Sequence, residues 1–285
     1  YGSRKVITRG GTLTDGRGAT GTLGGATFPT SQQETALTRG GGPANYAVSG
    51  ADNALYIKGD TTNAGVAPGK LRTRTTMMGD IVNSSPAYAA ETNTVYIGSN
   101  DGMLHAFNAA TGAEQFAYIP GIINFGYLAE LSRRDYDHRW FVDGPIVISP
   151  RSLSPNGDKN ILIGTLGRGG KGLYALDVTT PASFGTGNVM WERSTTSATP
   201  ADDNMGMVLG APVLAKVRGG SPTTSAVILG NGITEERAKD KDGNYIGQVK
   251  GSDKAALLVL TMNDGSIIRE IPAGTDTANG LFAPT

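Results

Sequence analysis

The sequence contains no cysteine, which excludes disulfide bonds, thiolate metal sites and cysteine nucleophiles. Its 25 Lys and Arg residues balance its 25 Asp and Glu residues. The chain therefore lacks the net positive charge that supplies most nucleic-acid affinity, and we predict no nucleic-acid partner. No apolar run reaches the roughly 18 residues that a membrane helix needs, so we predict no membrane insertion of this chain. Histidine and tryptophan occur only twice each.

Glycine, in contrast, is abundant, with 42 residues, and it separates short apolar stretches. Residues Gly79 to Pro120 are predicted to form four strands joined by turns, with Asn100-Asp101-Gly102 as a hairpin signal. The predicted strands are Ile81 to Tyr88, Val95 to Gly98, Met103 to Asn108 and Gln115 to Ile119. Four short antiparallel strands at this spacing indicate one blade of a β-propeller.

The blade pattern recurs further along the chain. Gly98, Gly164 and Gly230 each follow a β-branched apolar stretch, and they lie 66 residues apart. A proline precedes each unit, and one more lies near the end of the chain, giving Pro86, Pro145, Pro212 and Pro284. The predicted repeat units lie near residues 79–120, 141–194 and 204–274, with the start of another at 279–285.

The predicted fold class is therefore all-β: a quinoprotein-like β-propeller of four-stranded antiparallel blades with short helical insertions. Three units cannot close a ring, because propellers have about four to eight blades, so the propeller is predicted to be incomplete in this chain. The chain begins at Tyr1 rather than at a methionine and ends on a strand-like stretch. We expect it to be part of a longer protein.

Residues 1–78 are predicted to form an N-terminal lead-in of short helices and loops. Arg4 to Thr8 is predicted to be a strand, and Gly10 to Gly25 a loop. A helix is expected after Phe28, with Thr30 or Ser31 as its cap and a capping box three residues on. A second helix is expected from Pro43, with Tyr46, Val48 and Leu55 as its apolar residues.

Two further elements are predicted on either side of the first blade. The threonines between Arg72 and Met78 favour an extended strand. Residues Ile123 to Arg134 are predicted to form a helix with Phe125, Leu128 and Leu131 on one face. We expect this helix to cover one rim of the propeller.

An ordered series of motifs carries a family resemblance. The hairpin signature of the blades occurs in quinoprotein-type propellers and in type IV pilus proteins. The second group matches several stretches from Lys58 to Pro284: Ile57-Lys58-Gly59-Asp60, Gly79-Asp80-Ile81-Val82-Asn83-Ser84-Ser85-Pro86, Gly98 to Phe107, Tyr136 to Gly144, Gly230-Asn231-Gly232 and Asn279-Gly280-Leu281. The chain thus resembles the C-terminal β-propeller domain of the type IV pilus biogenesis and tip-adhesin family (PilC/PilY).

The resemblance implies a non-enzymatic factor that supports pilus assembly, opposes pilus retraction and contributes to adhesion and twitching motility. It implies an extracellular location at the pilus tip, cell surface or outer membrane of a Gram-negative bacterium. The expected partners are minor pilins of the tip complex and, on a host, cell-surface receptors. Two alternatives stay open: a quinone (PQQ)-dependent dehydrogenase, and an outer-membrane assembly scaffold. Trp140 and Trp191 are too few for the repeated tryptophan docking motifs of the dehydrogenases.

The resemblance also implies calcium binding by an Asp-rich loop, which in this family would lie just beyond Thr285. Within the chain, the candidate calcium ligands are Asp240, Asp242 and Asn244, because oxygen ligands at alternating positions suit a hard cation. The loop departs from the EF-hand pattern at Tyr245, where glycine is required, and at Gly251, where glutamate is required. A solvated hairpin tip is the favoured interpretation.

Lys58-Gly59-Asp60 stands where the family carries an Arg-Gly-Asp-like triplet, so these residues are a candidate receptor-binding site. The competing interpretation is a helix that ends with Gly59 as its C-cap, and this is the favoured one. Lysine further weakens the receptor hypothesis, because it is not equivalent to arginine at such a site.

The remaining polar residues are predicted to have structural roles. His105 is expected to point away from the apolar core, between Leu104 and Ala106, and His138 lies beside a Trp-Phe pair. Four acids next to glycines or at strand ends are expected to accept backbone amides in turns: Asp80, Asp101, Asp143 and Asp177. Gly167 to Gly172 resembles a phosphate loop, but it leads into a predicted strand rather than a helix, so a hairpin tip is predicted.

Overall fold

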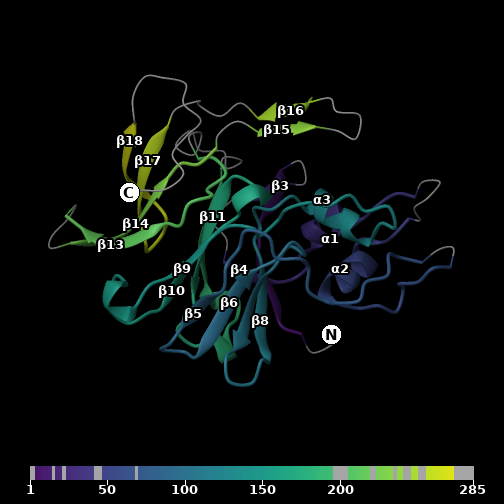
Figure 1. Cartoon of the computed structure of the whole chain (residues 1–285), viewed down its shortest axis with the longest axis horizontal. Coiled ribbons are helices and arrows are strands. Elements are labelled where there is room, and N and C mark those ends of the chain that lie inside the picture. The colour runs from purple at the N-terminus through teal and green to yellow at the C-terminus, as the bar shows by residue number, and fades with distance from the viewer. Residues whose placement is uncertain are drawn as a thin grey trace.

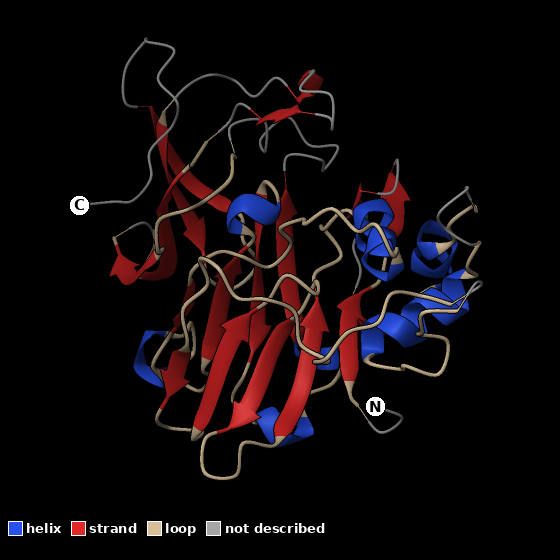
Figure 2. Ribbon diagram, turned by 45° about the vertical axis from the view of Figure 1, so that its right-hand side comes forward, coloured by secondary structure: helices blue, strands red, loops and turns tan. Residues whose placement is uncertain are grey.

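A computed structural model describes residues 4–14, 17–20, 24–41, 47–67, 70–194, 205–218, 223–233, 236–239, 245–249 and 255–272. Three sheets, each built on four antiparallel strands, stand side by side, and the helices α1 to α3 lie to one side of them (Figures 1 and 2). The three sheets are blades that do not close into a ring, which confirms the predicted all-β, incomplete propeller. Within the described residues no helix has the length and apolar character to cross a membrane.

Each blade contains four consecutively hydrogen-bonded strands. The first blade consists of β5 (Ala87–Ala89), β6 (Thr94–Gly98), β7 (Leu104–Asn108) and β8 (Glu114–Ile119). The second consists of β9 (Ile146–Ile148), β10 (Ile161–Thr165), β11 (Gly172–Asp177) and β12 (Val189–Ser194). The third consists of β13 (Val213–Val217), β14 (Thr224–Gly230), β17 (Ala256–Thr261) and β18 (Ile267–Pro272). Along the chain, β14 and β17 are separated by β15 (Glu236–Lys239) and β16 (Tyr245–Val249), which form a two-stranded sheet of their own.

The equally spaced glycines lie at or near the end of the second strand of each blade, as the repeat predicts. Two of them permit close approaches that any side chain would block. A Cβ atom on Gly98 would lie 2.3 Å from the carbonyl oxygen of Val142, and one on Gly164 would lie 2.2 Å from the Tyr174 ring. Glycine is therefore required at both positions, although the neighbouring group differs.

The second blade is buried on both faces, which explains its continuous apolar strands. Alternate residues of a strand point to opposite faces of its sheet. Ile161, Ile163, Leu173 and Ala175 pack with residues of the third blade. Leu162, Tyr174 and Leu176 pack instead with residues of the first blade. The outward faces of the flanking blades still expose apolar side chains, with Tyr88 on the first blade and Val213 on the third 59% and 45% exposed.

One aromatic position repeats between blades. Phe116 of β8 lies opposite Ala106, and Trp191 of β12 lies opposite Ala175, as the sequence repeat predicts. The Trp191 indole donates a hydrogen bond of 3.0 Å to the carbonyl oxygen of Met262. Trp191 therefore joins the second blade to the third through both apolar packing and a buried hydrogen bond.

The predicted first strand is much shorter than expected. The sequence predicts a strand from Ile81 to Tyr88, but β5 begins at Ala87, directly after Pro86. Before β5, side chains rather than a strand ladder make the contacts: Asp143 accepts from the Asn83 amide at 3.0 Å, and the Ser84 hydroxyl accepts from the Gly98 amide of β6 at 2.9 Å. Contacts with other segments of the chain therefore limit the strand to three residues.

The lead-in extends the first blade. Strand β1 (Val6–Arg9), which the sequence predicts one or two residues earlier, pairs in parallel with β8 and antiparallel with β4 (Gly25–Thr27). The prediction that Gly10 to Gly25 is loop is wrong, because β2 (Thr12–Thr14) and β3 (Arg17–Thr20) form a hairpin there. β-branched threonines favour strands even without an apolar alternation. The division of the chain into domains at residue 78 stays a prediction.

The first two helices pack together beside the first blade. Helix α1 (Ser31–Leu37) has the predicted capping box, in which Thr30 and Gln33 bond to each other's backbone amides. Helix α2 (Gly50–Lys58) begins at Gly50 rather than at the predicted Pro43, with Ser49 as its N-cap, because the Ser49 hydroxyl accepts from the Asp52 amide at 3.1 Å. Residues 43–46 lie outside the described residues. Leu55 is 43% exposed, whereas Ala54, Tyr56 and Ile57 form the buried face.

The third helix covers the rim of the first blade, as predicted. It comprises α3 (Phe125–Ala129), capped by Asn124, and the 3₁₀ turn η1 (Glu130–Ser132), so it is shorter than the predicted range. Phe125, Leu128 and Leu131 are all buried. Leu128 packs on Gly102 of the β6–β7 turn. The other 3₁₀ turns are η2 (Arg151–Leu153), η3 (Gly167–Gly169), η4 (Pro181–Ser183) and η5 (Thr186–Asn188).

Candidate functional site

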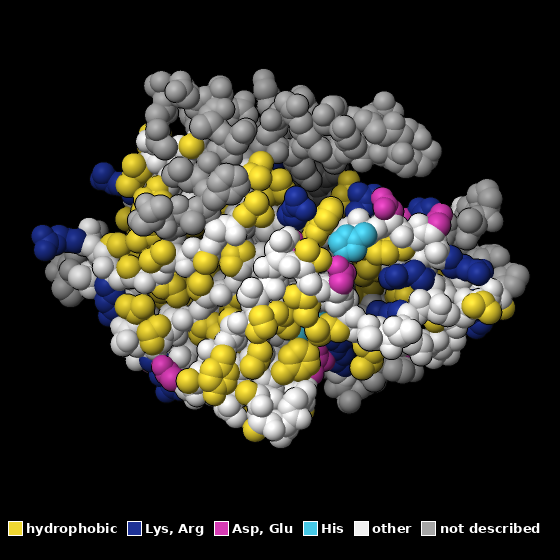
Figure 3. Space-filling model, viewed as in Figure 1, with side chains coloured by type: hydrophobic (Ala, Val, Ile, Leu, Met, Phe, Trp, Pro, Cys, Tyr) yellow, Lys and Arg dark blue, Asp and Glu magenta, His cyan; other side chains and the backbone are white. Residues whose placement is uncertain are grey.

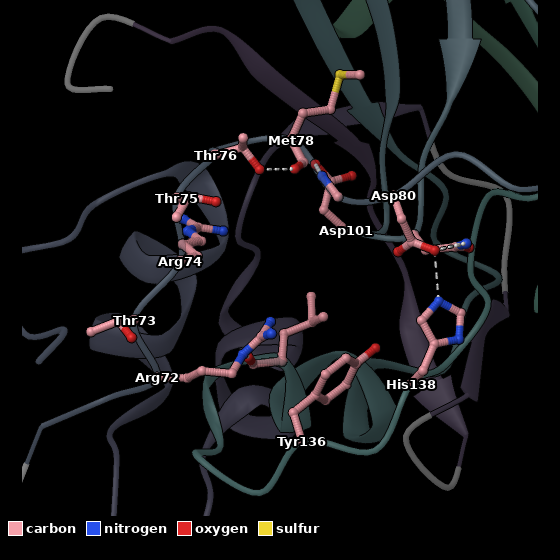
Figure 4. A pocket seen from close by; sticks show the side chains of 13 residues that line it. Arg72, Thr73, Arg74, Thr75, Thr76, Met78, Asp80, Asp101, Tyr136 and His138 are labelled. Atoms are coloured by element: carbon pink, nitrogen blue, oxygen red, sulfur yellow. Dashed lines mark hydrogen bonds and ion pairs between the residues drawn. The ribbon is translucent and has the colours of Figure 1, made fainter. Parts of the chain in front are cut away.

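A pocket of about 540 Å³ lies between the 3₁₀ turn η1 and the β6–β7 turn of the first blade. Three segments line it: residues 72–80, the β6–β7 turn at Asn100 and Asp101, and the stretch from Leu131 to His138. Figure 4 shows Arg72, Arg74 and Tyr136 on one side of the pocket and Asp80, Asp101 and His138 on the other. The site therefore combines cationic, aromatic and acidic side chains from segments that are distant in the sequence.

Hydrogen bonds fix the ends of the first lining segment. The Arg72 amide donates to the Ser132 carbonyl oxygen at 3.0 Å, and the Tyr56 hydroxyl donates to the Arg72 carbonyl oxygen at 2.9 Å. At the other end, the Gly79 amide donates to the Asp101 carboxylate at 3.0 Å. The predicted strand from Arg72 to Met78 is wrong, because these contacts tie the segment to helices and a turn and leave it irregular.

Both arginines of the pocket stack on tyrosines. The Arg72 guanidinium lies 4.6 Å from the Tyr136 ring centroid, and that of Arg74 lies 4.3 Å from the Tyr56 ring centroid. Burial lowers the pKa of Arg74 from its ordinary value. Within the described part of the chain, neither guanidinium forms an ion pair with a carboxylate.

Asp80, an exposed carboxylate in the pocket lining, already has partners. His138 Nε2 lies 2.8 Å from Asp80 Oδ2, and the two side chains are 41% and 51% exposed. The Asn100 side-chain amide also donates to Asp80, at 3.4 Å. The Trp140 ring meets His138 edge-on, with 5.1 Å between ring centroids. Asp80 is thus paired by a histidine and an amide, and we find no backbone amide on its carboxylate among the described residues, contrary to prediction.

A buried charged cluster lies beneath the pocket, and Asp101 belongs to both. His105 Nε2 lies 3.1 Å from Asp101 Oδ2, and His105 Nδ1 lies 2.8 Å from Glu114 Oε1. Arg4 donates two hydrogen bonds to the same Glu114 carboxylate, from Nε to Oε2 at 2.5 Å and from Nη2 to Oε1 at 2.7 Å. Two cations and two carboxylates therefore neutralise one another inside the protein.

The cluster changes the proton affinities of its members. Burial opposes the charged imidazolium, but the charge of Asp101 and the hydrogen bonds to Asp101 and Glu114 outweigh it and raise the pKa of His105 to about 9. Burial likewise opposes the carboxylate of Glu114, but hydrogen bonds from Arg4 and His105 lower its pKa to about 2. Burial also opposes the carboxylate of Asp101, but the charge and hydrogen bond of His105, the Gly79 amide and the charge of Arg4 together lower its pKa. His105 is therefore a cation at neutral pH.

These shifts predict how stability depends on pH. The folded pKa of His105 exceeds its ordinary value of 6.5, so its contribution is full below pH 6.5 and is lost as pH rises through about 9. The folded pKa of Glu114 lies below its ordinary 4.5, so its contribution is full above pH 4.5 and is lost as pH falls through about 2. Urea denaturation between pH 6 and 9.5 should show an alkaline loss of stability that a His105→Leu variant lacks. Equal alkaline slopes for both proteins would contradict the assignment.

The comparisons with known proteins fit the blade repeat. Residues 59–285 match the family model described as the PilY1 beta-propeller domain. The chain belongs to this family. It is 34% identical over 268 residues to a type IV pilus biogenesis factor PilY1 homolog of Xylella fastidiosa strain Temecula1, an alignment that covers 84% of this chain and 20% of that protein.

Two further matches come from Pseudomonas aeruginosa. Type IV pilus biogenesis factor PilY1 of strain UCBPP-PA14 is 32% identical over 287 residues, which covers 89% of this chain and 22% of that protein. The crystallised PilY1 C-terminal domain is 32% identical, with a TM-score of 0.47, and the match covers 67% of this chain and 32% of that domain. The chain thus spans about a fifth of the length of these curated PilY1 relatives.

The turn interpretation holds for two of the four acids, Asp101 and Asp177, whereas the amide on Asp143 comes from Asn83, 60 residues earlier in the chain. Asp101 accepts from the Met103 amide at 3.1 Å, Asp143 from the Asn83 amide at 3.0 Å, and Asp177 from the Thr179 amide at 3.1 Å. His105 does lie opposite the face of Leu104 and Ala106, as predicted, but that face is buried as well. Gly167 to Gly172 forms the β10–β11 connection, as predicted.

Of the two binding sites predicted from the sequence, only the receptor triplet lies among the described residues. Lys58, Gly59 and Asp60 end helix α2, and Gly59 is a left-handed C-cap with φ 113°. The Asp60 carboxylate accepts from the Thr62 amide at 2.7 Å. This geometry is the one that the helix-end interpretation predicts, and receptor binding stays a prediction. Asp240, Asp242 and Asn244 lie outside the described residues.

The pocket was not predicted from the sequence. The signal for it is the pair of arginines in Arg72-Thr73-Arg74, because both side chains line the pocket. The partners of the buried cluster carry no comparable signal, because Arg4 and Glu114 are 110 residues apart. Among the described residues, no group of acids and histidines has the arrangement of a metal site.

Proposed function

We propose that this chain is part of a non-enzymatic type IV pilus biogenesis factor. The observation that carries the proposal is the family match over residues 59–285, together with relatives that are named type IV pilus biogenesis factors. In this proposal the propeller supports pilus extension against retraction, and it contributes to surface adhesion and twitching motility. It acts outside the cell, at the pilus tip, on the cell surface or at the outer membrane, with minor pilins as partners.

The chemistry of the pocket supports binding more than catalysis. A general acid or base requires a proton-transfer group that is free to reach a substrate. Here the buried His105 donates to Asp101 and Glu114, and the exposed His138 is paired with Asp80. The two guanidiniums are the charged groups that the pocket leaves without an acidic partner among its described lining. An arginine cannot serve as a proton donor at neutral pH.

The experiment that tests the proposal is co-purification with minor pilins from cells that assemble pili. We expect the tagged protein to retain minor pilins, and an outer-membrane scaffold would retain barrel-assembly components instead. The quinone-dependent dehydrogenase alternative predicts dye reduction with alcohols or sugars after quinone and calcium are added. Turnover in that assay, or the absence of minor pilins from the purified complex, would contradict the proposal.

Two candidate sites complete the proposal. Calcium is proposed as a ligand of the family loop expected beyond Thr285, with Asp240, Asp242 and Asn244 as the candidate ligands inside this chain. Calorimetric titration with and without Asp242→Asn tests the inner site, and identical binding would exclude it. Lys58-Gly59-Asp60 is proposed as a contact for host-cell surface receptors. Equal attachment of Asp60→Ala and unchanged protein to host cells would exclude that contact.

A further inference from the structure

The cations of the pocket are held in place before any ligand arrives. Stacking on Tyr136 and Tyr56 restricts both guanidiniums. Hydrogen bonds to the Leu131 carbonyl oxygen, at 2.9 Å from Arg72 Nε, and from Arg74 to the Tyr56 carbonyl oxygen restrict them further. Because the side chains are already ordered, binding an anion costs little additional conformational entropy.

The charge of the pocket favours an anionic ligand. Of the two carboxylates in its lining, Asp80 is paired with His138, and Asp101 is paired with His105 and accepts two backbone amides. Arg74 also has a buried Nε atom without a hydrogen-bond partner in the described part of the chain. Lys and Arg side chains gather on this helical side of the molecule (Figure 3). A planar carboxylate matches the fork of N–H donors that a guanidinium presents.

The backbone beside the arginines favours a polypeptide over a small anion. In residues 73–77, Thr73, Thr75, Thr76 and Met77 are exposed. Among the described residues, no backbone hydrogen bond joins this stretch to a neighbouring segment. Unpaired amides and carbonyl groups along an exposed, non-helical stretch can pair with an extended peptide, as in recognition by strand addition.

We propose that this pocket binds the carboxylate of an acidic peptide segment, which Arg72 and Arg74 hold while the backbone of residues 73–77 pairs with the peptide. The carboxylate belongs to an acidic side chain or to a C-terminus. The pocket volume admits a few residues and not a folded domain. The inference is independent of the role in pilus biogenesis, since purified protein suffices to test it.

The test measures fluorescence anisotropy of a labelled glycine–serine peptide with blocked ends and one central glutamate. Its glutamine counterpart, a glutamine peptide with a free C-terminus, and inorganic phosphate complete the set of ligands. We expect the glutamate peptide, the free C-terminus, or both to bind the full chain, and the blocked glutamine peptide to bind at least about tenfold more weakly. The double variant R72Q/R74Q should lose a similar factor. Arg168→Gln is the matched control, because Arg168 also stacks on an aromatic ring, that of Trp140 at 5.2 Å, outside the pocket.

The outcomes distinguish a side-chain carboxylate from a C-terminal one, and a peptide ligand from a small anion. Tight binding of only one carboxylate peptide identifies an acidic side chain or a C-terminus as the ligand. Binding of the blocked glutamine peptide as tight as that of both carboxylate peptides would overturn the proposal, as would equal losses in R168Q and R72Q/R74Q. Phosphate that displaces the peptide at equal concentration would reassign the pocket to small anions and also overturn it. Should R72Q/R74Q fail to fold, the comparison of the peptides on the unchanged chain still decides.

Discussion

Replacing His105 by leucine is expected to destabilise the chain by about 3–5 kcal/mol, the usual cost of removing one partner from a buried ion pair. His105 is fully buried, and its loss leaves the Asp101 carboxylate without its imidazolium. Glu114 keeps Arg4 but loses its second partner. The shift should be measured as a change in the urea midpoint at pH 6.5, where the cluster is fully charged.

The other histidine of the chain is a matched control. His138 also pairs with an aspartate, but both side chains are exposed by two fifths or more. Solvent-exposed pairs contribute about 0–1 kcal/mol, so His138→Leu should shift the midpoint little. Equal shifts for the two variants would contradict the assignment of a buried charged cluster to His105.

A double substitution tests whether the charge is the cause. Adding Asp101→Asn to His105→Leu removes the carboxylate that the single change leaves buried and unpaired. Contacting charges are not additive, so the double variant should be less destabilised than the sum of the two single changes. Strict additivity would mean that His105 contributes through packing alone.

The blades could be predicted from the sequence because their determinants are local. Each signal acts within a few residues of the chain: a glycine near the end of the second strand, the Asn100-Asp101-Gly102 turn, and a proline before β5, β9 and β13. The repeat adds a second level of consistency, because Phe116 and Trp191 occupy the same register. Agreement between local signals and a repeat makes such a fold identifiable.

The pocket and the charged cluster could not be predicted because long-range contacts create them. The sequence contains no signal that β1 pairs in parallel with β8, which brings Arg4 against Glu114. The irregular course of residues 72–78 depends likewise on Ser132 and Asp101, which lie on other elements. Threonine content favours a strand there, and tertiary contacts override that preference.

The second large effect concerns the pilus itself. In the full-length protein, His105→Leu should abolish pilus assembly at growth temperature, since a loss of about 3–5 kcal/mol is a large fraction of the stability of a typical domain. His138→Leu should leave assembly intact. We therefore expect cells with His105→Leu to lack pili and cells with His138→Leu to keep them. This difference is the largest effect that we predict.

The most direct test of the account is therefore a count of surface pili by electron microscopy in a strain that lacks this gene. Genes for the unchanged protein and for His138→Leu should both restore pili, whereas the gene for His105→Leu should not, even though all three are expressed. Normal pili in the strain without the gene would contradict a role in pilus biogenesis. Full restoration by His105→Leu would contradict the dependence of that role on the folded propeller.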